Sequence, residues 1–241
     1  MNRSVCAAMI AACVALLGGC STTPESLAAN DPFEPMNRAV YHFDQRVDRS
    51  VVVPLAGLYF LYLPAPVHHG LTNIFINLDM PVTFANDLLQ LRPAAAARAL
   101  GRFALNTTLG VGGLVDLATP AGIPYKPADF GQTLGRYGVP EGPFLVLPII
   151  GPAPPRDLAG DGVDIAMHPL FWLPPAVPAL QRALVSTAIH AGAPFEEHAT
   201  HIVLRQELER GSVDPYVTMR SIYRQLRDQD INGDQSVPMP K

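Results

Sequence analysis

The sequence predicts a fold of many short helices, and three observations support this. Pro accounts for 25 of the 241 residues, about twice its average share, and proline interrupts long helices. Apolar residues recur at helical spacing, as in Met36, Val40, Phe43 and Val47. Charged residues make up only 16% of the chain while apolar residues reach 49%. We therefore expect short helices with part of their surface kept out of bulk water.

The N-terminus resembles a bacterial lipoprotein signal. Arg3 is followed by an apolar segment that ends at Leu17-Gly18-Gly19-Cys20, and all three cysteines of the chain lie in these first twenty residues. An ordinary signal peptide or a membrane anchor is the alternative, but the apolar segment is short for a span. We expect residues 1–19 to be removed as a signal peptide, Cys20 to carry lipid, and residues 20–35 to form a lipidated tether.

The first helix is expected from Met36 to Val47. Its apolar stripe is interpreted as the buried face, with Asn37, Arg38, Tyr41 and Asp44 lying off that stripe. An all-helical domain is expected to run from here to residue 230, and residues 231–241 are expected to be a disordered tail.

The segment from Ser50 to Leu78 is the most membrane-like part of the mature chain. It contains no Asp, Glu, Lys or Arg over 29 residues, a length that could cross a bilayer. Three prolines leave Leu55–Leu63 as the longest unbroken apolar run, and nine helical residues cover only roughly 13 Å. Interfacial or half-inserted helices are therefore expected here, rather than a spanning helix.

Pro and Gly mark most of the later element boundaries. Pro81 and Pro93 are each expected to open a helix, because a first helical position does not need the missing N–H. The second of these helices should break at Gly110-Val111-Gly112-Gly113. Further elements are expected at 129–137 (a capped helix), 144–150 (a strand or extended segment), 154–168 and 196–209 (helices), and from Asp214-Pro215-Tyr216 onward (a helix). Trp172 is either a headgroup-level anchor or a core residue.

Candidate metal sites are weak. Asp157, Asp161, Asp164 and His168 share one helix face and could seat a metal, but an Arg-paired or solvated acidic face is the favoured interpretation. Glu197-His198-Ala199-Thr200-His201, with His190 nearby, lacks a complete ligand motif. The segment 228–234 matches only the first half of a calcium loop, since Met239 stands where the bidentate Glu is needed. No metal and no cofactor are predicted.

Two function classes are disfavoured. The formal charge of −4 offers no basic face for nucleic acid. The Gly110–Gly113 run lacks the third glycine and the βαβ context of a dinucleotide site. Nothing in the pattern supports catalysis, so the chain is not predicted to be an enzyme and no catalytic residue is assigned.

The mature chain resembles the VacJ/MlaA outer-membrane lipoproteins of Gram-negative bacteria, in ordered blocks that run through most of its length. The main blocks are Asn30-Asp31-Pro32-Phe33-Glu34-Pro35-Met36-Asn37-Arg38, Asn73-Ile74-Phe75-Ile76-Asn77-Leu78, Arg102 to Asp116, Asp129-Phe130-Gly131-Gln132-Thr133-Leu134-Gly135, Arg156-Asp157 and Asp214-Pro215-Tyr216.

That resemblance implies an all-α ring of amphipathic and interfacial helices in the periplasmic leaflet of the outer membrane, with a central amphipathic channel. It further implies association with trimeric porins. The implied activity is to remove phospholipid mislocalised in the outer leaflet and pass it to a periplasmic carrier, MlaC, which maintains lipid asymmetry. The short tail, which is not strongly acidic, departs from the family pattern.

Residues of the central stretch are the candidates for the lipid path. The hypothesis places there Asn106, Thr107, Gly110, Gly112, Gly113, Asp116 and Gln132. The alternative for the polar ones is that they cap helices and satisfy buried backbone groups. Two other functions stay open: a structural adaptor that tethers porins or lipid carriers, and a metal-dependent lipid hydrolase that uses the Asp157 face.

Overall fold

The computed structural model describes residues 23–172, 178, 181 and 211–232. Within them the chain is helical apart from loops and one two-stranded sheet, so the predicted all-α fold is confirmed. The elements are α2 (Pro24–Ala28), α3 (Glu34–Val47), the π-helical turn η1 (Asp48–Val52), α4 (Val53–Tyr62), α5 (Ala65–Leu89), α6 (Pro93–Thr108), α7 (Phe130–Arg136), β1 (Val146–Leu147), β2 (Gly151–Pro152), α8 (Pro155–Met167), the 3₁₀ turn η2 (Pro169–Trp172) and α11 (Pro215–Asn232).

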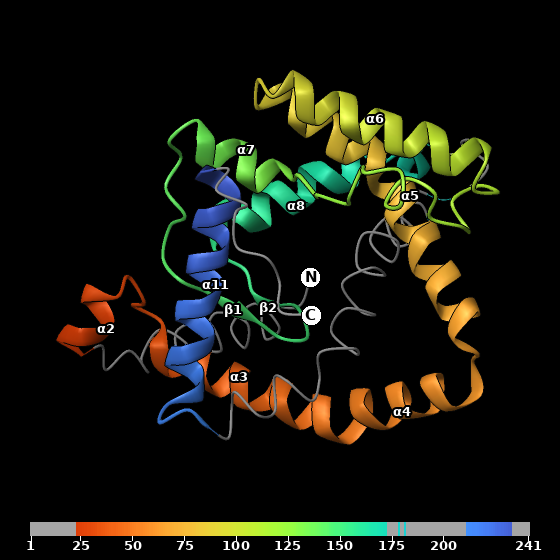
Figure 1. Ribbon diagram of the computed structural model, residues 1–241. Helices are drawn as coiled ribbons and strands as arrows, with labels where there is room; N and C mark the ends of the chain where they lie inside the picture. The colour runs from red at the N-terminus through yellow and green to blue at the C-terminus, as the bar shows by residue number, and fades with distance from the viewer. Residues whose placement is uncertain (1–22, 173–177, 179–180, 182–210, 233–241) are drawn as a thin grey trace.

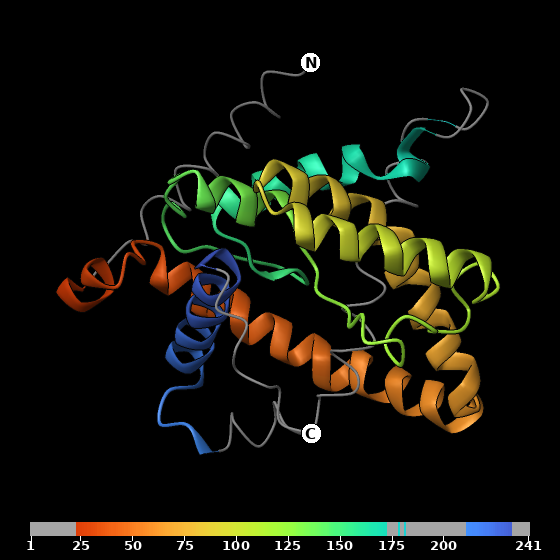
Figure 2. The ribbon, with the colours of Figure 1, turned by 45° about the horizontal axis from the view of Figure 1, so that its top comes forward.

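The helices follow one another around a frame rather than stacking in layers. In Figure 1, α3 and α4 form one edge, α5 rises from the end of α4, α6, α7 and α8 form the opposite edge, and α11 leads back toward α3. The view in Figure 2 shows the same order, with the β1–β2 hairpin lying between α8 and α3. The frame places residues from distant parts of the sequence side by side.

Two helices are longer than the proline count predicted. Helical structure runs unbroken from Glu34 to Tyr62, with the wide turn η1 directly before α4 and Pro54 in the first turn of α4. α5 is 25 residues long and contains Pro81, so the prediction that Pro81 opens a helix is wrong. α5 packs along α6 more extensively than any other pair of described elements, and such packing can offset the backbone hydrogen bond that proline removes.

The buried face of α3 differs from the one predicted. Asn37 and Tyr41 are buried, whereas Met36 and Phe43 are 36% and 46% exposed. Asn37 is held by both of its amide atoms: Nδ2 donates to Phe144 O and Oδ1 accepts from Val146 N. α3 therefore faces the rest of the protein with this side, and of its apolar stripe Met36 and Phe43 are exposed while Val40 packs against the core.

None of the described helices is by itself long and apolar enough to cross a membrane. The helices Glu34–Tyr62 and Ala65–Leu89 pass the length and composition test only as a pair, and they are bent by 118° at their junction. The interfacial position of these helices stays a prediction. Trp172 is 71% exposed, which excludes the alternative that it is a core residue.

Helix starts were the best-predicted features. Pro93 stands in the first turn of α6, and Pro155 in the first turn of α8. The Asp129 side chain accepts a hydrogen bond from Gln132 N and caps α7. Asp214 Oδ1 accepts from Tyr216 N and Val217 N at the start of α11. Carboxylate caps of this kind satisfy backbone donors that have no partner inside the helix.

A small aromatic core joins α3, the hairpin and α11. Tyr41, Phe144, Val146 and Tyr216 are buried together, and Met219 and Tyr223 of α11 pack against them. β1 pairs antiparallel with β2, with Val146 opposite Pro152. The extended segment predicted at 144–150 is therefore a two-residue strand whose neighbours fill this core.

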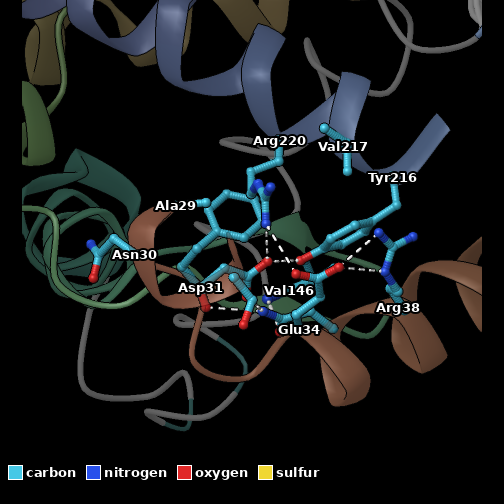
Figure 3. Close-up of polar contacts among 12 residues, drawn as sticks. Ala29, Asn30, Asp31, Glu34, Arg38, Val146, Tyr216, Val217 and Arg220 are labelled. Atoms are coloured by element: carbon cyan, nitrogen blue, oxygen red, sulfur yellow. Dashed lines mark hydrogen bonds and ion pairs between the residues drawn. The ribbon is translucent and has the colours of Figure 1, made fainter. Parts of the chain in front are cut away.

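A cluster of polar side chains joins the segment just before α3 to α11 (Figure 3). The Asp31 side chain is fully buried: its Oδ2 accepts from Tyr216 Oη and Arg220 Nη1, each at 2.5 Å, and its Oδ1 accepts from Asn37 Nδ2. Arg38 forms two hydrogen bonds to the Asp214 carboxylate, and Figure 3 shows its contact with Glu34. Asp31 lies in the segment assigned to a tether, so the folded part of the chain begins before residue 36.

Two further arginines of α11 extend this attachment. Arg224 Nη1 donates to Ala29 O at 2.5 Å, and its Nη2 lies 2.7 Å from Glu141. Arg227 bonds both oxygens of Asp129 and also Asp157. We call Arg220, Arg224 and Arg227 with their carboxylate partners the α11 clasp.

Candidate functional site

The central loop, defined here as residues 109–119, begins where α6 ends. Its amides close over the last turn of the helix: Gly112 N donates to Thr107 O at 3.0 Å and Gly113 N to Asn106 O at 2.8 Å. Val111, Gly112 and Gly113 have φ angles of +56°, +70° and +94°. This left-handed conformation suits glycine and is strained for a β-branched residue such as Val111. The predicted break of the helix at 110–113 is confirmed.

Two of the three glycines are required by close contacts. A Cβ on Gly110 would lie 2.3 Å from Val115 O, and one on Gly113 would lie 2.6 Å from the Asn77 Cβ. A Cβ on Gly112 would meet nothing within 4 Å. Gly110 and Gly113 therefore allow the loop to lie against itself and against α5, whereas Gly112 contributes only its backbone conformation.

Asn106 fastens the loop to the end of α6. Its Oδ1 accepts from Leu117 N and Ala118 N at 2.9 and 3.0 Å, and its Nδ2 donates to Asp116 Oδ1 at 3.1 Å. The side chain is only 2% exposed. The alternative interpretation of Asn106, that it satisfies buried backbone groups, describes these contacts.

Asp116 is the electrostatic centre of the loop. Its Oδ2 lies 2.7 Å from Arg102 Nη2 and accepts from Thr119 Oγ1 at 2.5 Å. Partial burial acts to raise the pKa of Asp116, but hydrogen bonds from Thr119, Arg102 and Asn106 outweigh it and lower the pKa to about 2. The carboxylate is therefore charged at neutral pH and neutralised by Arg102.

Thr107 links the loop region to α5. Its side chain accepts a hydrogen bond from Asn77 Nδ2 at 2.9 Å, and Asn73 Nδ2 donates to Leu114 O at 3.3 Å, one helical turn away on α5. Asn73 and Asn77 were not predicted as site residues. Their four-residue spacing beside the apolar stripe of α5 is the signal that could have identified them.

Six of the seven candidate path residues therefore gather at the central loop. The seventh, Gln132, lies on α7, near the opposite end of α6 from the loop (Figure 1), and is 3% exposed. No hydrogen bond among the described residues joins Gln132 to the loop. Cys20 lies outside the described residues.

The surface of the loop is apolar although its framework is polar. Leu109 and Val111 are 67% and 70% exposed, and Leu114 and Val115 are 44% and 46% exposed. A second apolar surface lies on α4, where Leu55, Leu58, Leu61 and Tyr62 are exposed. Such groups of exposed large apolar side chains mark contacts with lipid or with another protein.

Comparisons with known proteins agree with these features. The sequence model of a family described as MlaA lipoprotein matches residues 29–230. A relative from Haemophilus influenzae, the intermembrane phospholipid transport system lipoprotein MlaA, is 37% identical over 87% of this chain and 83% of its own length. The protein of the same name from Escherichia coli K12 is 34% identical over 92% of this chain and 87% of its own length. The chain belongs to the MlaA lipoprotein family.

A solved structure supports the family assignment at the level of the fold. It was reported as the structural basis for maintenance of bacterial outer membrane lipid asymmetry, and one of its chains is 32% identical with a TM-score of 0.72. The match covers 84% of this chain and 99% of that one. The MlaA fold is therefore shared over almost the whole of the solved chain.

In this MlaA-family chain the acidic face of α8 is part of the scaffold. Asp157 is bonded by Arg156, Arg227 and Tyr223; burial acts against the charge, but these partners hold its pKa below the usual range. Asp164 accepts from Asn86 Nδ2 and Phe130 N. Within the described residues no group of three or more His, Cys, Asp or Glu side chains could hold a metal ion.

Two further candidate metal motifs were considered from the sequence, the half calcium loop at 228–234 and the segment around Glu197. The residues 228–232 of the half calcium loop are the last turn and a half of α11 rather than a loop. The segment with Glu197, His198 and His201, together with His190, lies outside the described residues.

Proposed function

We propose that this chain is an outer-membrane lipoprotein that removes phospholipid mislocalised in the outer leaflet and passes it to a periplasmic carrier, thereby maintaining lipid asymmetry. The observation that carries this proposal is the family match over residues 29–230, together with relatives named for intermembrane phospholipid transport. The proposal includes a lipid anchor on Cys20, a position in the periplasmic leaflet, trimeric porins as neighbours, and MlaC as the carrier. It involves no covalent chemistry on the lipid.

The exposed apolar side chains support a protein that lies within a leaflet. Leu58, Leu61 and Tyr62 of α4 are 49%, 73% and 75% exposed, a cost in water that acyl chains would remove. Their helix carries no charged residue. α4 is therefore proposed to face lipid.

The candidate path residues divide into two roles. Thr107 and Gly112 are exposed and are proposed to lie beside the moving lipid. Asn106, Gly110, Gly113 and Asp116 make the contacts that shape the central loop and are proposed to act by positioning its apolar side chains. Gln132 is proposed to act at a separate point on α7.

Complementation tests the function. The chain is expressed in a Gram-negative host that lacks its own MlaA-family protein, and phosphatidylethanolamine at the cell surface is labelled with an impermeant amine reagent. The expected result is that labelling falls to the level of the parent strain, while a Cys20→Ala variant leaves it high. High labelling despite correctly localised, lipidated protein contradicts the proposal.

Photo-crosslinking separates transport from an adaptor function. A photoreactive amino acid replaces Leu109, Val111, Leu114 or Val115 in living cells, and attached phospholipid is measured. Leu226, which is 53% exposed on α11, serves as the matched control. Lipid attached at the loop and not at Leu226 supports a lipid path, whereas porin cross-links without lipid indicate an adaptor.

A further inference from the structure

A pocket lies between α5, the first half of α6 and the segment that returns toward α7. Its volume is about 280 Å³. Its walls are formed by Met80 and Asp87 from α5, by one face of α6 with the residue that precedes it, and by Pro124, Lys126 and Pro127. The α6 face consists of Arg92, Ala95, Arg98, Ala99 and Arg102, which recur every three to four residues.

The lining is strongly basic. Arg92, Arg98, Arg102 and Lys126 stand against a single carboxylate, Asp87. Arg102 is paired with Asp116 and Arg92 lies beside Asp87, so the charges that repel across the pocket are chiefly those of Arg98 and Lys126. The chain as a whole is acidic, with a formal charge of −4. The pocket is therefore a local reversal of the overall charge.

Two of the four cations are committed to the scaffold. Arg102 donates to Thr119 Oγ1, Ile123 O and Asp116, and its side chain is 4% exposed. Arg92 lies 4.0 Å from Asp87 and donates to Gln90 Oε1 at 3.4 Å.

The other two cations remain available. Arg98 on α6 and Lys126 on the returning segment both line the pocket and are exposed. Among the described residues neither forms an ion pair or a hydrogen bond with a carboxylate, although Asp87, which lies beside Arg92, also attracts Arg98. An anion seated between them would relieve the repulsion and receive hydrogen bonds from both sides.

We propose that this pocket binds one phosphate group. Guanidinium and ammonium groups are the side chains that recognise phosphate oxygens, with Arg able to bond two oxygens at once. The volume lies just below the range of about 300–1,000 Å³ for pockets that hold drug-sized ligands. It therefore suits a headgroup-sized ligand, with Met80, Ala95 and Ala99 as the apolar part of the wall.

The phosphate could come from a lipid headgroup or from a soluble phosphate compound, and the recognising chemistry is the same. The phosphate site does not involve the apolar surface of the central loop and does not rest on the proposed transport function. Loss of phosphate binding is measured by dialysis, whereas loss of transport is measured by lipid labelling at the cell surface.

Equilibrium dialysis tests the site on the full lipidated chain in an uncharged detergent. The probes are radiolabelled inorganic phosphate and dihexanoyl phosphatidylglycerol, with dihexanoylglycerol as the probe that lacks phosphate. The variants are Arg98→Gln and Lys126→Gln, singly and together. Arg46→Gln, an exposed arginine on α3, makes the same charge change away from the pocket.

The expected result is saturable binding of a phosphate-bearing probe that weakens about tenfold in each single variant, as for the loss of one charged hydrogen bond. Both variants should keep the unfolding midpoint of the parent, because their side chains are exposed. Binding of inorganic phosphate assigns a soluble ligand, and binding of the lipid alone assigns a headgroup.

Three results overturn the proposal. The first is the absence of saturable binding of either phosphate-bearing probe. The second is an affinity of the double variant equal to that of Arg46→Gln. The third is equal binding of dihexanoylglycerol, which would make the pocket a site for the acyl or glycerol part.

Discussion

α4 and α11 lie on different edges of the same frame, and they differ in charge and in how they contact the rest of the protein. α4 has no charged residue, and most of its large apolar side chains are exposed. α11 is rich in arginine, and Arg220, Arg224 and Arg227 each pair with a carboxylate from another part of the chain. Both are helices of one small protein, yet of the two only α11 is held by ion pairs among the described residues.

The difference indicates where the stability of the molecule comes from. Partly buried Arg–carboxylate pairs with several hydrogen bonds fix geometry, and breaking one of them leaves an unpaired charge. Exposed apolar side chains contribute little to the folded state in water but gain free energy in a membrane. We therefore expect substitutions in the clasp to change folding, and substitutions in α4 to change association with lipid.

The largest loss of stability is expected for Asp31→Ala. The substitution leaves the Arg220 guanidinium and the Tyr216 hydroxyl without their buried partner, at a cost of about 3–5 kcal/mol in the free energy of unfolding. Urea unfolding of the purified chain in mild detergent measures it. Glu25→Ala, at an exposed acid on α2, is the control, and equal effects of the two substitutions would refute the central role of Asp31.

A smaller loss is expected for Gly113→Ala. The new Cβ would lie 2.6 Å from Asn77 Cβ at a φ of +94°, so strain and overpacking together should cost about 2–4 kcal/mol. The same assay should give about 1 kcal/mol for Gly112→Ala, where only the φ of +70° is unfavourable. Gly57→Ala in α4 has open space and should be neutral or slightly stabilising. A reversed order would contradict the close contact with α5.

Acid should weaken the central loop by about 2 kcal/mol. Asp116 has a folded pKa of about 2 against an ordinary value of 3.8, so its stabilising contribution is present above pH 4 and lost as the pH falls toward 2. Its side chain is 21% exposed, which limits solvent screening. Unfolding of the parent and of Asp116→Asn is compared between pH 5 and pH 2. The variant should lose less stability on acidification, and parallel curves would exclude this role.

The smallest effect on folding is expected for Leu61→Gln in α4. This side chain is 73% exposed, so the free energy of unfolding should change by no more than about 0.5 kcal/mol. Partition of the non-lipidated Cys20→Ala form onto vesicles should nevertheless weaken severalfold. Leu226→Gln on α11 is the matched control. Unchanged partition for Leu61→Gln would remove α4 from the lipid-facing surface.

Local signals predicted most of the helices. Pro93, Asp129 and Asp214 mark helix starts because each acts within one turn of the backbone, where sequence neighbours decide the structure. Pro81 lies inside α5 rather than at a helix start, because α5 packs along α6, and the local sequence does not reveal that packing.

The buried face of α3 could not be derived from its apolar stripe. That inference assumes water outside and a dry core inside, whereas α3 turns Asn37 and Tyr41 inward to partners about 100 residues or more away in sequence. At the candidate site, the residues from Asn106 to Asp116 are neighbours in the sequence, and the sequence predicts them as one site. The sequence does not predict that Arg102 and Asn77 hold this segment in place, because their hydrogen-bond partners are set by the tertiary fold.

The clasp also has a consequence for the order in which the molecule can form. Tyr216 and Arg220 reach Asp31 across 185 and 189 residues, and Arg224 reaches Ala29 across 195. Loop-closing contacts of this length form slowly, after local helices and hairpins. The contacts of Ala29 and Asp31 with α11 therefore cannot form until α11 has been synthesised. A chain interrupted before residue 215 would contain α3 to α8 but not α11, the helix that closes the frame.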